Sequence, residues 1–158
     1  MALLERDVLD LLVRVAALEA YVTYPTTGTW TPTFVGSTTA GVFTYTTQSG
    51  VYTRGPASLV YIAARIVISA IGTPPAGDMR IGGLPFTCEA GYYHAVNFGF
   101  ISNINYTAAA LQLTGLVDVG NTYISLYESF DNSGALSYPA VNFTNVAADL
   151  IFSAVYRV

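Results

Sequence analysis

Residues 59–70, LVYIAARIVISA, are the longest apolar segment of the chain, and read as an extended strand they place apolar side chains on both faces. Such strands are typical of sheets that are covered on both sides. The C-terminal segment 149–158, DLIFSAVYRV, has the same character. Two strands of this kind are hard to bury within one small antiparallel domain. The sequence therefore predicts that other subunits cover part of their surface.

The rest of the chain from residue 29 onward also has the composition of strands. β-branched and aromatic residues fill short segments that clusters of Gly, Pro, Asn and Ser separate. This spacing predicts an antiparallel, jelly-roll-like β-sandwich over residues 28–158. The expected strands are Thr29–Val35, Val42–Thr47, Gly50–Arg54, Leu59–Ala70, Asp78–Ile81, His94–Ile101, Ala110–Leu116, Thr122–Glu128 and Ala148–Val158.

Residues 1–24 have a helical pattern instead. Apolar residues follow one another at alternating steps of four and three, which is the heptad seam of a coiled coil with Val at a and Leu at d. The seam residues are Leu4, Val8, Leu11, Val15, Leu18 and Val22. Leu12 widens the apolar stripe of the helix and favours a coiled coil of more than two helices, although the heptad alone also allows a dimer. We expect a coiled-coil helix that trimerises or anchors the chain and ends before Pro25. The alternative is a helix packed on its own β domain.

The composition narrows the classes of partner. The 158 residues include no Lys, six Arg and ten acidic residues, for a net charge of −4. We therefore expect no nucleic-acid binding, because no patch neutralises phosphates. Hydrophobic residues make up 53%, but no uninterrupted apolar run of membrane-spanning length exists, and acidic residues near the start argue against an export signal. The composition predicts a soluble, obligate oligomer without membrane insertion.

Three blocks of sequence resemble the C-terminal domains of bacteriophage tail fibres and related virion proteins. They are GTWTPTF (28–34), AGVFTYTTQSGVYTR (40–54) and GDMRIGGLPFT (77–87), in that order. The resemblance covers residues 28–88 and implies a homotrimeric β-sandwich at the virion surface, with the second block as a hairpin. It does not fix the role, because similar domains act as receptor-binding tips, head fibres or capsid-decorating trimers. We expect attachment to a host-surface glycan. A capsid decoration or head-fibre protein that binds the major capsid protein is the alternative.

Exposed aromatic residues on loops are the candidate ligand-binding residues, because a ring face and a polar tip suit a sugar. The chain has twelve Tyr and eight Phe, most of which a core must bury. The candidates are Tyr92 and Tyr93 in GYYH, and Phe130, Asp131 and Asn132 in SFDNSG. The alternative for each is a turn whose aromatic ring folds back onto the sheet. Trp30 is assigned to packing or to the junction between the helix and the sandwich, and not to a ligand.

The sequence offers little for catalysis. Cys88 and His94 are each the single residue of their type, so we expect a packed thiol and a hydrogen-bonded or surface histidine, and no zinc site. A glycan hydrolase with paired carboxylates is the disfavoured alternative. The acidic residues of the β region are interpreted as a solvated loop surface; they are Asp78, Glu89, Asp118, Glu128, Asp131 and Asp149. We expect no enzyme activity, cofactor or metal.

Overall fold

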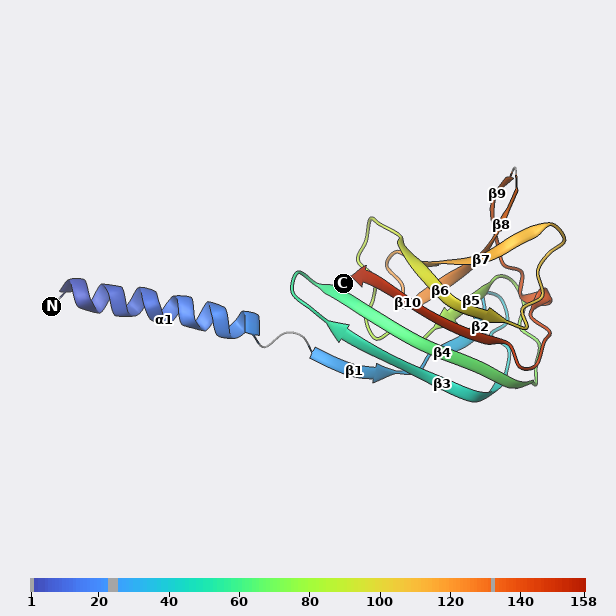
Figure 1. Ribbon diagram of the computed structural model, residues 1–158, viewed down its shortest axis with the longest axis horizontal. Coiled ribbons are helices and arrows are strands. Elements are labelled where there is room, and N and C mark those ends of the chain that lie inside the picture. The colour runs from blue at the N-terminus through green and yellow to red at the C-terminus, as the bar shows by residue number, and fades with distance from the viewer. Residues whose placement is uncertain (1, 23–25, 132) are drawn as a thin grey trace.

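The computed structural model describes residues 2–22, 26–131 and 133–158, and in the N-terminal helix it describes the side chains of residues 6–19. The helix, α1 (Ala2–Val22), precedes the β domain and extends away from it (Figure 1). The strands are β1 (Thr26–Trp30), β2 (Thr33–Gly36), β3 (Phe43–Arg54), β4 (Leu59–Ile71), β5 (Met79–Gly82), β6 (His94–Ser102), β7 (Ala110–Val117), β8 (Tyr123–Phe130), β9 (Ser133–Ser137) and β10 (Asp149–Arg157). A short 3₁₀ helix, η1 (Ala140–Asn142), precedes β10.

Within the described residues, the ten strands form one antiparallel sheet. Its order is β1-β3-β4-β10-β6-β7-β8-β5-β2, and β9 pairs with β8 outside this path. The last strand in the sequence, β10, therefore lies between β4 and β6. The prediction of a mainly β protein with an N-terminal helix and antiparallel strands is confirmed.

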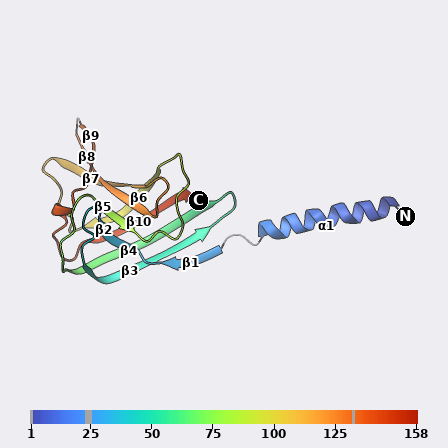
Figure 2. The same cartoon turned by 180° about the vertical axis from the view of Figure 1, so that it is seen from behind.

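The sheet curls so that the two ends of this path meet (Figures 1 and 2). Phe34 of β2 lies against Phe43 of β3, with ring centroids 6.1 Å apart. The backbone N–H of Phe34 donates a hydrogen bond of 2.9 Å to the hydroxyl of Tyr45, also on β3. Strands from opposite ends of the path thus face each other across the core, which makes the fold sandwich-like.

The core is formed by alternate residues of the two longest apolar strands. The buried residues of β4 and β10 are Val60, Ile62, Ala64, Ile66, Ile68, Leu150, Phe152, Ala154 and Tyr156. Trp30 is buried against Phe152 in an edge-to-face contact, with centroids 6.3 Å apart. Its predicted packing role is therefore confirmed. Gly50 lies beneath the indole, where an added Cβ would be 2.4 Å from Trp30 Nε1.

Two strand predictions are wrong, and each has a local cause. The expected strand Thr29–Val35 is divided at Thr31–Pro32 into β1 and β2, because Pro32 has no N–H for a ladder. The expected strands 42–47 and 50–54 are one strand, β3, so the second block of the resemblance is no hairpin. Gly50 makes room for Trp30 inside a strand and does not mark a turn. Strand β9 was not predicted, because SFDNSG was interpreted only as a turn.

Candidate functional site

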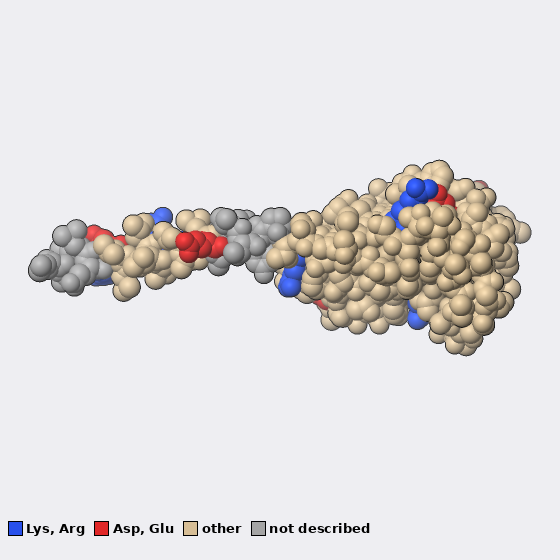
Figure 3. Space-filling view, turned by 90° about the horizontal axis from the view of Figure 1, so that it is seen from below, with Lys and Arg blue, Asp and Glu red and all other residues tan. Residues whose placement is uncertain are grey.

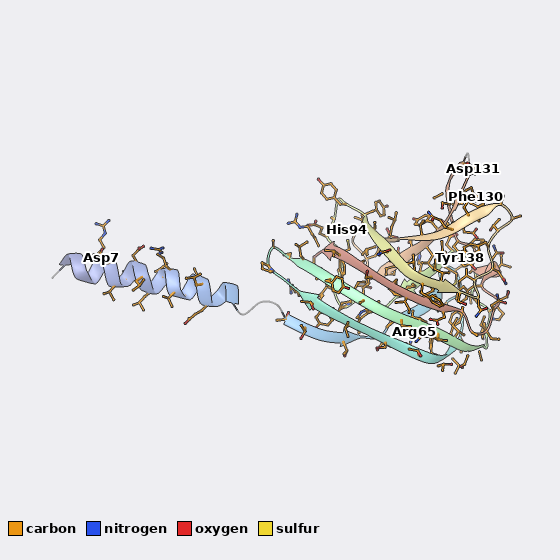
Figure 4. All side chains as sticks on the ribbon, viewed as in Figure 1. Asp7, Arg65, His94, Phe130, Asp131 and Tyr138 are labelled. Atoms are coloured by element: carbon orange, nitrogen blue, oxygen red, sulfur yellow. The ribbon has the colours of Figure 1, made fainter. Side chains whose placement is uncertain are left out.

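The heptad seam of α1 is uncovered in the structure. Every side chain described between residues 6 and 19 is exposed, including Val8, Leu11, Val15 and Leu18. The side chains of Leu4 and Val22 lie outside the described residues. The described seam therefore does not pack on the chain's own β domain, and Figure 4 shows the side chains of α1 projecting without a neighbouring element. An apolar stripe of this kind gains stability only when a partner covers it.

A second uncovered apolar surface lies on the β domain, and we call it the outer face. It consists of the outward-facing apolar residues of β3, β4, β10 and β6, which are Val51, Leu59, Tyr61, Ala63, Val67, Phe100, Ile151 and Val155. The strand register makes them neighbours: Val155 lies opposite Tyr61, and Ile151 opposite Phe100. The inner faces of β4 and β10 are buried as predicted, whereas their outer faces are exposed in the single chain.

The charges on the outer face nearly neutralise one another. Arg65 projects from it and forms an ion pair with Asp149 on the adjacent strand, at 2.7 Å. The hydrogen bonds to Asp149, together with its negative charge, raise the pKa of Arg65. Charged residues are sparse on the side of the β domain seen in Figure 3. A shallow hollow of about 310 Å³ beside the ion pair is lined by Ser49, Val51, Ala63, Arg65 and Ile151, among others.

The predicted ligand-binding residues fall into two groups. Tyr92 and Tyr93 precede β6 and are 71% and 60% exposed. Phe130 is half-buried at the end of β8, and Asp131 is exposed at the tip of the β8–β9 hairpin. Asn132 lies outside the described residues. Both groups thus include exposed side chains, as the prediction requires.

The structure does not bring these groups together. His94, next to Tyr93, pairs with Val117 at one end of β7, and Phe130 pairs with Ala110 at the other. Ala110 and Val117 are seven positions apart along β7, which corresponds to about 23 Å of strand. Figure 4 labels His94 and Phe130 at opposite ends of the β domain.

The end that carries Tyr92 and Tyr93 is the end near α1. The backbone N–H of Arg157 donates to His94 Nε2 at 3.5 Å. Arg157 lies opposite Leu59 at the start of β4. The next residue of β4, Val60, pairs with Arg54 at the end of β3. Arg54 in turn pairs with Thr26, the first residue of β1, which follows α1. We therefore call the opposite end, with the β8–β9 hairpin, the distal end.

A buried carboxylate supports the distal end. Glu128 is 1% exposed, so its interpretation as a solvated loop acid is wrong. Its Oε1 accepts a hydrogen bond of 2.6 Å from the backbone N–H of Thr107. The hydroxyl of Tyr138 donates to the carbonyl of Asn105 at 2.8 Å. Burial and the nearby Glu128 charge raise the pKa of Tyr138. These contacts fix the loop between β6 and β7 to the hairpin.

Asparagine side chains connect the same loop to the segment before β10. Asn105 Nδ2 donates to Thr144 Oγ1, Asn145 Nδ2 donates to Asn105 Oδ1, and Asn142 Nδ2 donates to Thr107 Oγ1, each at 2.8 Å. Sequence analysis missed this network. Its signal is the density of Asn and Thr in NINYT (103–107) and VNFTN (141–145). The distal loops are held in a defined arrangement by these bonds.

The remaining candidates are structural. Cys88 is buried, as predicted, and burial raises the pKa of its thiol. Across the described residues, no cluster of three or more His, Cys, Asp or Glu has the arrangement of a metal site. No helix among them is both long and apolar enough to cross a membrane.

Comparison with known proteins gives a likeness of fold. No protein-family model and no curated protein matches the sequence. A solved structure, that of the Dettilon tailspike protein, superposes with a TM-score of 0.68 at 14% sequence identity. The match covers 84% of this chain and 24% of the tailspike chain, so the chain corresponds to about a quarter of that protein's length. The β domain thus has a fold that is also found within a bacteriophage tailspike, and no specific family is shown.

Proposed function

We propose that this chain is a bacteriophage virion-surface protein that acts as a tail-fibre-type homotrimer and attaches to a host-surface glycan without catalysing a reaction. The observation that carries the proposal is the likeness of fold to part of a tailspike protein. The order of the three tail-fibre-like blocks in the sequence also supports it.

The uncovered apolar surfaces support a homo-oligomer. The seam of α1 and the outer face belong to different parts of the chain, and both expose large apolar side chains. Patches of this kind on soluble proteins mark interaction sites. A symmetric assembly covers both surfaces with copies of the same chain. A parallel three-stranded coiled coil of α1 would place three β domains around one axis.

The distal end is the proposed glycan-contacting end. Phe130 and Asp131 lie at its hairpin, and the hydrogen bonds of Glu128 and the asparagine network hold the neighbouring loops. A preformed surface loses less conformational entropy on binding. Three copies on one axis convert weak single sites into avid attachment. Glu128, the buried acid, is engaged with a backbone N–H, which fits a supporting role.

The second candidate is a capsid decoration or head-fibre protein. The outer face favours it, because an apolar surface with one internal ion pair also fits a major capsid protein. In that arrangement α1 and the outer face would bind the capsid, and the role would be structural. The two candidates differ in where the protein lies on the virion.

Immunoelectron microscopy of intact virions with an antibody against the β domain tests both candidates. We expect label at the tail. Label over the capsid would replace the attachment proposal with the decoration proposal. Virions that contain the chain by mass spectrometry but label at neither place would contradict a surface role, and virions that lack the chain would contradict both candidates.

A further inference from the structure

The sheet opens between β6 and β7, and we call this opening the wedge. The two strands pair only from His94–Val117 to Val96–Gly115. Beyond Val96, β6 continues along β10 to Ser102, while β7 continues along β8 back to Ala110. The hollow between them has a volume of about 260 Å³. Its lining includes Asn97, Phe98, Ile101, Gln112, Leu113 and Thr114.

Packing inside the sheet builds the wedge. The ladder of β6 and β10 shifts register between Ile151 and Phe152, so that Gly99 has no partner and β6 bends. The ring of Phe98 covers Gly115, where an added Cβ would be 3.1 Å from the ring. Phe98 also contacts Phe152, with centroids 5.9 Å apart. The floor of the wedge is therefore fixed by core residues.

The wedge combines an apolar floor with an uncharged polar rim. Phe98, Ile101 and Leu113 form the floor, and Leu113 is buried. At the rim, the exposed side-chain amides of Asn97 and Gln112 make no hydrogen bond to the described part of the chain. Each amide offers two N–H donors and one carbonyl acceptor. Among the described residues, no charged side chain lines the wedge, so its lining suits an uncharged ligand that both donates and accepts hydrogen bonds.

Tyr106 adds an aromatic surface beside the wedge. Its hydroxyl lies near the backbone of Leu113, which lines the wedge, and its side chain is 38% exposed. A partly exposed ring in this place suits stacking against the apolar side of a sugar.

From these features we infer that the wedge binds a neutral sugar residue, with Asn97 and Gln112 hydrogen-bonding its hydroxyls and Tyr106 stacking on its ring. This inference rests on the proposed attachment function and names the ligand class and the site. It differs from the candidate residues at the two ends of the β domain. The alternative occupant is an extended peptide, which the separated edges of β6 and β7 also suit. The free amides and the partly exposed ring of Tyr106 favour the sugar.

Saturation-transfer difference NMR on the full chain tests the inference. The probes are glucose, galactose, rhamnose, N-acetylglucosamine and an octapeptide of alternating Thr and Val. The test variant combines Asn97→Ala with Gln112→Ala, two exposed side chains whose loss leaves the core intact. Val42→Ala is the matched control, because it truncates a 58% exposed side chain just before β3, outside the wedge and outside the predicted ligand-binding residues. A Tyr106→Ala variant tests stacking separately.

We expect at least one sugar to give a transfer signal, at least tenfold weaker binding in the double variant, and unchanged binding in Val42→Ala. Sugar binding that the double variant retains would overturn the wedge as the site while leaving glycan attachment in place. If the octapeptide binds and no sugar binds, the inference of a sugar ligand is overturned. The wedge would then bind an extended peptide that adds to the sheet as a strand. Absence of binding by any probe, on a protein that labels at the virion tail, would overturn the inference and leave the virion-surface role intact.

Discussion

Arg65 and Asp149 form two parallel hydrogen bonds across the β4–β10 ladder, from Nε to Oδ1 at 3.1 Å and from Nη2 to Oδ2 at 2.7 Å. Arg65 lies opposite Ile151, and Asp149 lies opposite Val67, so the pair is surrounded by the apolar outer face. A bidentate pair tolerates burial better than a lone charge, because each ion satisfies the other. The outer face can therefore be covered by another subunit without leaving these two charges unpaired.

A charge placed on the outer face should separate the subunits. Val155 is 50% exposed in the single chain, so Val155→Asp leaves the monomer fold intact but buries an unpaired carboxylate in the proposed interface. We expect sedimentation velocity to show a shift from trimers towards smaller species. Val141→Asp is the matched control, because Val141 is 74% exposed on η1. Equal mass for both variants and the wild type would exclude the outer face as the interface.

The seam of α1 makes a similar prediction about helix formation. Leu11 lies on the seam, whereas Leu9, which is equally exposed, lies off it. Since a helix of three heptads is marginal alone, Leu11→Asp should lower the helical signal in circular dichroism together with the oligomer mass. Leu9→Asp should leave both near the wild-type values. A helical signal that neither variant changes would show that α1 needs no partner along this seam.

Gly50 should be intolerant of even one added carbon. A Cβ there would lie 2.4 Å from the indole nitrogen of Trp30, so Gly50→Ala should lower the free energy of unfolding by about 1–3 kcal/mol through overpacking. Denaturant unfolding monitored by fluorescence of the single Trp measures the effect. Gly134→Ala is the control, because no atom of the described residues lies within 4 Å of an added Cβ there. Similar midpoints for the two variants would contradict the packing of Trp30 on β3.

Buried tyrosines predict a loss of stability at alkaline pH. Burial raises the pKa of Tyr156 from 10.0 to about 12, and its hydroxyl donates to the carbonyl of Phe86 at 3.2 Å. Between pH 10 and 12 the unfolded chain loses this proton while the folded chain keeps it. The free energy of unfolding should therefore be constant below pH 10 and then fall by about 1.4 kcal/mol per pH unit for this group.

Unfolding measured from pH 8 to 12 should show a smaller slope for Tyr156→Phe than for the wild type. Tyr138 has its pKa raised in the same direction by burial, so the double variant with Tyr138→Phe should have a smaller slope still. Identical slopes for the wild type and both variants would mean that these hydroxyls ionise alike in the folded and unfolded chains.

Much of the fold follows from local sequence patterns. Segments 59–70 and 149–158 are predicted as strands because of their continuous apolar character, and they are β4 and β10. The seam from Leu4 to Val22 predicts the helix because its period is that of a helix. The errors arise where a residue serves a distant contact. Gly50 has the local signature of a turn, but its role is set by Trp30, twenty residues earlier.

The candidate sites were less accessible to sequence reasoning. Exposure of Tyr92 and Tyr93 follows from their position beside Gly91, whereas their distance from Phe130 depends on the register of β7 with β6 and β8. Glu128 is of a residue type that usually lies at the surface. Its burial becomes visible only in the fold, because the loop between β6 and β7 brings the backbone N–H of Thr107 to its carboxylate. The wedge forms where the hydrogen-bonded ladder between β6 and β7 ends, and no local sequence pattern predicts that point.

The central position of β10 has a consequence for how the chain is made. β4 and β6 are separated by β10, so neither can complete its ladder until Asp149–Arg157 has left the ribosome. Until then, both strands keep open edges, which in other proteins recruit foreign strands. The helix α1 emerges before the β domain, and β10 emerges after the two strands that it joins. A chain that stops before residue 149 therefore cannot finish its own sheet, and translation errors late in the message should yield aggregates or degraded chains in place of defective subunits.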